Sequence, residues 1–133
     1  MVISAKQVFI GLVTIGTLDV FWMGFSAKKL YRRHLSHVML KPENMLTQQW
    51  FAAALAWIAI IFGILIFVIP QVLTASLMDT ASLGGLFGAL TYGIYELTNY
   101  ALLKHWPITI VAMDILWGTF LCGLLTVVLA LTA

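Results

Sequence analysis

Charged residues are scarce in this chain of 133 residues, where they make up 9% of the sequence. Soluble domains carry about 25% charged residues, because polar side chains must cover their surface. Hydrophobic residues instead account for 62% of this chain. The shortage of charge excludes an ordinary soluble domain and favours a protein whose solvent is the lipid bilayer.

Cysteine and the common catalytic motifs are also nearly absent. Cys122 is the only cysteine, which excludes an intrachain disulfide and a CxxC metal or redox site. There is no glycine-rich phosphate loop, no Ser-His-Asp order and no glutamate-bearing metal motif. His34 and His37 have a spacing that can bind a metal on a helix, but cationic neighbours oppose it and no third ligand is evident. We therefore expect no cofactor and no metal.

Long apolar runs are what the sequence has in abundance. Four of them, at about residues 8–27, 50–73, 81–103 and 108–131, are long enough to cross the ~30 Å hydrocarbon core at ~1.5 Å of helical rise per residue. They take up most of the chain and leave room for one domain. The predicted fold class is all-α, an integral membrane four-helix transmembrane bundle formed by residues 1–133.

The first two of these runs have features that bear on their assignment as spans. The first could be mistaken for a secretory signal, but Asp19 interrupts it and Phe25 occupies a position that needs a small residue. We expect it to be retained as a span. The second run, 50–73, lacks charged residues and is expected to face mainly lipid or a second copy of the chain.

The basic residues predict the orientation. Five of the seven lie between Lys28 and Lys41 in the connector 28–49, and Lys104 lies between the third and fourth runs. Because Lys and Arg concentrate in cytoplasmic loops, both connectors are expected on that side. Both termini then face outward, into the periplasm if this is a bacterial inner (cytoplasmic) membrane protein. Basic residues beside a hydrophobic run indicate contact with anionic lipid headgroups rather than nucleic acid.

Three of the five acidic residues, Asp19, Glu96 and Asp114, lie inside the predicted spans. A charge at a helix centre costs roughly 2.5 to 3.5 kcal/mol, so acids placed there are candidate functional groups. Counting helical rise from Lys28 and from Lys104 puts each acid roughly 12 to 15 Å from the basic boundary. We therefore expect the three carboxyl groups to meet at one level in the cytoplasmic half of the bundle.

Aromatic and small residues accompany the acids. Two of the acids are followed by tryptophan in the pattern D-x-x-W, which places acid and indole on one helical face. The third lies on a polar face of its span, beside small-residue stripes that include Gly84 and Gly88 and allow close helix packing. We predict that spans one, three and four enclose an acidic and aromatic cluster, whose members are Asp19, Glu96, Asp114, Trp22, Trp117, Tyr92 and Asn99.

The function favoured by this cluster is binding or movement of a small polar or cationic ligand, an ion or a lipid headgroup. No basic residue lies at that depth, so either some acids are protonated or a cation lies among them. Membrane lipids are expected partners, and transport would require a homodimer because four short spans are small for a full path. Two alternatives stay open: a membrane enzyme or accessory of lipid modification, using the carboxyls for proton transfer, and a structural or assembly protein whose acids are hydrogen-bond glue.

The stretch from Tyr92 to Asn99, followed by Trp106-Pro107 and then by Asp114 to Gly118, resembles a family of predicted bacterial inner-membrane proteins, domain of unknown function 2177. The segment around Asp19 and the basic connector also fit, so the resemblance covers nearly the whole chain. The family commonly has Asp where this chain has Glu96, which preserves the acid and lengthens its reach. The resemblance implies a compact four-span protein without an established activity. Some relatives are encoded near lipid-modifying enzymes, which favours a lipid-linked role.

Overall fold

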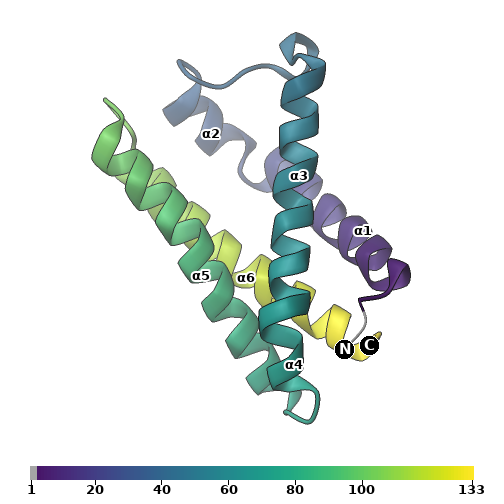
Figure 1. The fold of residues 1–133 in the computed structure, drawn as a ribbon. Helices are drawn as coiled ribbons and strands as arrows, with labels where there is room; N and C mark the ends of the chain where they lie inside the picture. The colour runs from purple at the N-terminus through teal and green to yellow at the C-terminus, as the bar shows by residue number, and fades with distance from the viewer. Residues whose placement is uncertain (1–2) are drawn as a thin grey trace.

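The structure is a computed structural model that describes residues 3–133, and in this part of the chain the regular elements are all helical (Figure 1). The all-α class is therefore confirmed for the described residues. The elements follow one another as α1 (Ala5–Phe21), η1 (Trp22–Ser26), α2 (Lys28–Leu35), η2 (Pro42–Asn44), α3 (Thr47–Gly63), η3 (Ile64–Val68), α4 (Ile69–Val72), α5 (Leu77–Leu102) and α6 (Ile108–Leu131).

Within residues 3–133, three helical segments are long and apolar enough to cross a membrane, by length and composition: Ala5–Ser26, Thr47–Val72 and Ile108–Leu131. The helix α5 has 26 residues, which is long enough at ~1.5 Å per residue. It carries Glu96 and many small or polar residues, which lower its apolar character. The part of the chain that the structure describes therefore has three candidate spans, and the predicted fourth span stays a prediction.

The helices α5 and α6 form a tightly packed antiparallel hairpin. The connector between them is closed by His105, whose φ of 60° lies in the left-handed region. A Cβ added at Gly84 would overlap the side chain of Thr126, and one added at Gly88 would overlap the carbonyl oxygen of Gly118. The prediction that small residues let this helix approach its neighbour closely is confirmed.

The second apolar segment packs against the rest of the protein along one face. Ile61, Ile64 and Leu65 are fully buried, and they form one core with Ile15 of α1 and Leu121 of α6. This face is turned away from lipid or a second copy, whereas most residues of 50–73 are exposed, as expected for a segment that faces mainly outward. Its branched side chains fill the space between α1 and the α5–α6 hairpin, where close packing stabilises helix association.

Two π-helical turns interrupt the apolar segments. In η1 the N–H of Ala27 donates to the carbonyl of Trp22 at 2.8 Å, a bond over five residues that widens the turn. The other, η3, ends just before Pro70, which has no N–H to continue the α-helical pattern. The first turn ends α1, and the chain continues as α2 in a new direction (Figure 1).

The helix α2 is amphipathic and docks on α6. Its residues Tyr31 and Leu35 are buried in one cluster with Ile110 of α6, while its Lys and Arg residues are exposed. The helix ends at Leu35, and Val38 and Met39 lie beyond it and are exposed.

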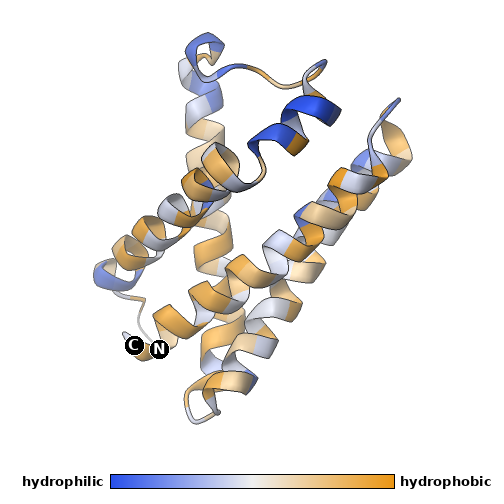
Figure 2. Cartoon of the chain, turned by 180° about the vertical axis from the view of Figure 1, so that it is seen from behind, coloured by the Kyte–Doolittle hydropathy of each residue, from blue (hydrophilic) through white to orange (hydrophobic). Residues whose placement is uncertain are grey.

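The connectors divide between two ends of the molecule. The segment from α2 to the start of α3 and the turn between α5 and α6 lie at one end, while both termini and the turn before α5 lie at the other (Figure 1). Figure 2 shows hydrophilic residues gathered on α2 and apolar residues along the long helices. We call the first of these the basic end, because α2 and Lys104 lie there. The predicted topology also places these two connectors at one end, and the side of the membrane that this end faces stays a prediction.

Candidate functional site

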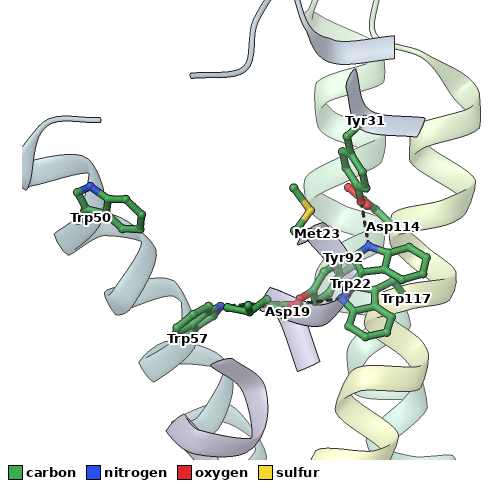
Figure 3. Close-up of a pocket in the computed structure, with 10 residues that line it drawn as sticks. Asp19, Trp22, Met23, Tyr31, Trp50, Trp57, Tyr92, Asp114 and Trp117 are labelled. Atoms are coloured by element: carbon green, nitrogen blue, oxygen red, sulfur yellow. Dashed lines mark hydrogen bonds between the residues drawn. The ribbon is translucent and has the colours of Figure 1, made fainter. Parts of the chain in front are cut away.

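A cavity of about 350 Å³ lies toward the basic end, bounded by α1 and η1, α2, α3, α5 and α6 (Figure 3). Aromatic rings form most of its lining, two carboxyl groups point to it, and no basic side chain is among its lining residues. We call it the aromatic cavity. It is lined by Asp19, Val20, Trp22, Met23, Tyr31, Trp50, Trp57, Tyr92, Asp114 and Trp117.

Asp19 ties three helices together at this cavity. Its Oδ2 accepts a hydrogen bond from Nε1 of Trp57 at 2.8 Å, and its Oδ1 accepts one from Nε1 of Trp117 at 2.9 Å. The donors belong to α3 and α6, 38 and 98 residues along the chain from the acid. Figure 3 shows Asp19 between the two indoles. Because both carboxyl oxygens are engaged, this residue holds the walls of the cavity in place.

A pair of stacked indoles forms one wall. The rings of Trp22 and Trp117 lie parallel, with centroids 4.5 Å apart and planes 3° from each other. The indole N–H of Trp22 donates to the hydroxyl of Tyr31 at 3.4 Å. Trp22 is the first residue of η1, so the widened turn sets its position. The indole partners of Asp19 are thus Trp57 and Trp117 on other helices, whereas the spacing in the sequence had paired the acid with Trp22.

Asp114 is the second acid of the aromatic cavity. It lies on α6, is half-buried, and lines the same space as Asp19. Its carboxyl group is on the side of the cavity nearest Tyr31 (Figure 3). Within residues 3–133 the structure gives indole partners to Asp19 and to Glu96 and no hydrogen bond to the Asp114 carboxyl. Of the two acids that line the aromatic cavity, Asp114 is therefore the one whose carboxyl can still bind a donor.

Glu96 lies apart from the aromatic cavity. Its side chain is fully buried, and its Oε2 accepts a hydrogen bond from Nε1 of Trp106 at 2.8 Å. Its Oε1 has no hydrogen-bond partner among the described residues. Trp106 packs against the cluster of α2 and α6 that contains Tyr31 and Ile110. Glu96 therefore contributes to the junction between α2 and the hairpin.

The structure brings together five of the seven predicted site residues and separates the other two. Glu96 and the half-buried Asn99 are not among the lining residues of the aromatic cavity. The expected meeting of all three acids is thus reduced to two. The residues that do line it are Asp19, Trp22, Tyr92, Asp114 and Trp117.

Sequence reasoning missed the contributions of the second apolar segment and of α2. Trp57 binds Asp19, and Trp50 and Tyr31 line the cavity. One signal was available: Trp50 and Trp57 are seven residues apart, which puts both indoles on one helical face. The lack of charge in residues 50–73, interpreted as contact with lipid, concealed that face.

The chemistry of the aromatic cavity suits an organic cation better than a metal ion. Ring faces attract cations by their quadrupole, and a carboxyl group supplies charge and hydrogen-bond acceptors. Metal ions need more ligands than this, and residues 3–133 contain no group of three or more His, Cys, Asp or Glu side chains placed to hold one.

Comparison with known proteins places the chain in a family without giving it an activity. A family model described as a predicted membrane protein (DUF2177) matches residues 4–131, and this range includes every element that lines the aromatic cavity. No curated protein and no solved structure matches the chain. The resemblance noted in the sequence is confirmed.

Proposed function

The chain belongs to the DUF2177 family of predicted membrane proteins, and from this premise we propose that it is a small binding protein of the bacterial cytoplasmic membrane, whose aromatic cavity holds a cationic ligand. In this proposal the basic end faces the cytoplasm and both termini face the periplasm, as the concentration of Lys and Arg on α2 favours.

The fourth span of this proposal is α5. Its least apolar residues are shielded, because Gly84, Gly88 and Glu96 are buried. The residues that it exposes include Leu86, Leu90, Ile94 and Leu97, and such side chains suit contact with acyl chains. A helix that turns its polar groups inward and its aliphatic groups outward is stable in lipid in spite of a moderate average hydropathy.

The observation that carries the proposal is the carboxyl of Asp114 in a cavity with aromatic walls and no basic lining residue. A carboxylate without a counter-charge is costly in a low-dielectric environment. A cation that enters the cavity supplies that charge, and it gains up to about 2 kcal/mol from the ring faces when desolvated. Asp19, with both oxygens engaged, orients Trp57 and Trp117 around the ligand.

A second candidate function is purely structural, and the two hydrogen bonds to Asp19 favour it. In this alternative the acids serve as hydrogen-bond glue between helices, and the cavity has no ligand. The two candidates differ in what they require of Asp114, which binds the ligand in the first and is dispensable in the second.

Tryptophan fluorescence tests the proposal directly, because four of the five tryptophans line the aromatic cavity. The purified protein in detergent is titrated with ethylammonium chloride, with sodium chloride at equal ionic strength as the reference. We expect a saturable change with a dissociation constant of about 1 mM for so small a ligand, weakened about tenfold in Asp114→Asn, which removes the counter-charge.

The matched control is Asp79→Asn, which removes an exposed carboxyl in the first turn of α5, at the opposite end of the molecule. It should bind ethylammonium like the parent protein. Absence of a saturable change in the parent protein, or equal binding by Asp114→Asn, would rule out the cation site and leave the structural alternative.

A further inference from the structure

The open side of the aromatic cavity is apolar. Val20, Met23 and Trp50 line the cavity and are 64%, 38% and 53% exposed. Val20 and Met23 belong to the candidate span Ala5–Ser26, and Trp50 belongs to the candidate span Thr47–Val72. Since these faces contact lipid in a spanning helix, the cavity opens sideways into the membrane between α1 and α3.

The end of the cavity nearest α2 carries the opposite charge from its acids. Tyr31 lines the cavity, Arg32 follows it directly, and Lys28 lies one helical turn before it, with both cationic side chains exposed. Long basic side chains at this position can reach the headgroup layer while their stems stay against the protein. A ligand bound at Asp114 therefore has positive charge beside it at the rim.

This distribution of charge discriminates between classes of cation. A ligand with only a positive charge is attracted by Asp114 and repelled by Lys28 and Arg32. A ligand with an ammonium joined to a phosphate is attracted at both ends, because arginine and lysine bind phosphate oxygens. Acyl chains attached to that phosphate would lie along the apolar opening.

We propose that the ligand of the aromatic cavity is a phospholipid with a primary amine in its headgroup, whose ammonium lies at Asp114, whose phosphate contacts Lys28 and Arg32, and whose acyl chains leave between α1 and α3. This inference rests on the proposed function and names the class of ligand. A primary ammonium fits better than a quaternary one, because the Asp114 carboxyl needs an N–H donor.

The experiment compares lipids in which one feature at a time is missing. Delipidated protein in detergent is titrated with phosphatidylethanolamine, with phosphatidylglycerol of the same chains, which has no amine, and with O-phosphoethanolamine, which has no chains. The fluorescence of the cavity tryptophans reports binding. We expect phosphatidylethanolamine to bind about tenfold more tightly than either of the others, as a ligand that satisfies all three features should.

A pair of double variants separates the contribution of Lys28 and Arg32 at the rim from that of Asp114 inside the cavity. Lys28→Gln with Arg32→Gln should weaken phosphatidylethanolamine about fivefold and leave ethylammonium unchanged or tighter, because the repulsion at the rim is gone. Lys6→Gln with Lys104→Gln removes the same charge away from the lining residues and should alter neither. All four side chains are exposed, so these variants should fold.

Each other outcome has a definite meaning. If ethylammonium binds but the two lipids bind equally, the lipid assignment is wrong and the cation site stands. If O-phosphoethanolamine binds as tightly as the lipid, the ligand is a soluble phosphoamine and the lipid assignment again fails. If neither ethylammonium nor any of the lipid-derived probes binds, both the cation site and the lipid assignment are wrong.

Discussion

The α5–α6 hairpin consists of two halves that differ in how closely the helices approach each other. In the half near the termini, Gly84 and Gly88 leave no room for a Cβ against α6. In the half near the basic end, α6 instead presents Asp114 and Trp117 to the aromatic cavity. The boundary is the contact of the Tyr92 ring with Gly118. A single helix pair is thus packed closely at one end and lines an open space at the other. We call the half with Gly84 and Gly88 the closed half, and the half with Asp114 and Trp117 the open half.

The comparison shows how a small membrane protein can hold a cavity open. Close packing without side chains fixes the relative position of the two helices, because their backbones are in contact. The open half then keeps its shape without apolar side chains between the two helices. The acids near it accept hydrogen bonds from indole N–H groups: Asp19 accepts two and Glu96 accepts one. The closed half supplies the stability on which the open half depends.

The largest expected effect comes from adding one methyl group to the closed half. Gly88→Ala places a Cβ onto the carbonyl oxygen of Gly118, and neither backbone can move without opening the hairpin. We expect a loss of about 3 kcal/mol, the cost of severe overpacking, measured by denaturant unfolding in detergent micelles.

The matched control is the same substitution in the open half. A Cβ at Gly93 would meet no atom within 4 Å, so Gly93→Ala should be neutral or should stabilise the helix by up to about 1 kcal/mol. Equal effects at the two glycines would abolish the distinction between the halves.

An intermediate effect is expected from the buried acid of the open half. Trp106→Phe removes the only hydrogen bond that the described residues offer to Glu96. A buried polar group without a partner costs about 1 to 3 kcal/mol, and we expect about 2 kcal/mol in the same unfolding measurement. Adding Glu96→Met should recover most of this loss, because removal of both partners leaves no orphaned group. Failure of the second change to rescue the first would show that Trp106 acts only through packing.

The smallest effect separates the two acids of the aromatic cavity. Asp19→Asn replaces one acceptor oxygen with a donor, so one indole bond is lost, at a cost of about 1 kcal/mol in a membrane helix bundle. Asp114→Asn breaks no hydrogen bond between the described residues and should change the unfolding free energy by less than about 0.5 kcal/mol. A greater loss of stability at Asp114 than at Asp19 would reverse the roles assigned to the two side chains.

Spacing along the chain was sufficient to predict the closed half. The repeat of glycine at Gly84 and Gly88 identifies a helix face that must touch another backbone, whatever the partner. The similar distance of Asp19 and Asp114 from the basic end also followed from helical rise alone. Both are properties of one helix considered separately.

The pairing of side chains could not be predicted in this way. Depth does not give the direction in which a residue points, so Glu96 was grouped with two acids although it turns toward Trp106. Trp57 was assigned to lipid because its segment has no charge, yet its position between α1 and the hairpin brings it to Asp19. The π-turn at Trp22 had no signal in its sequence. These features depend on how helices cross, which the order of residues does not state.

The two hydrogen bonds of Asp19 have a consequence for the order of events during biosynthesis. The first helix leaves the ribosome before either of its indole partners exists, and Trp117 is made 98 residues later. Until then the carboxyl would cost roughly 2.5 to 3.5 kcal/mol at the centre of a bilayer. We therefore expect the first helix to lie at a shallow depth, or beside the insertion machinery, until the last helix is inserted. It should reach its final depth in the membrane only then.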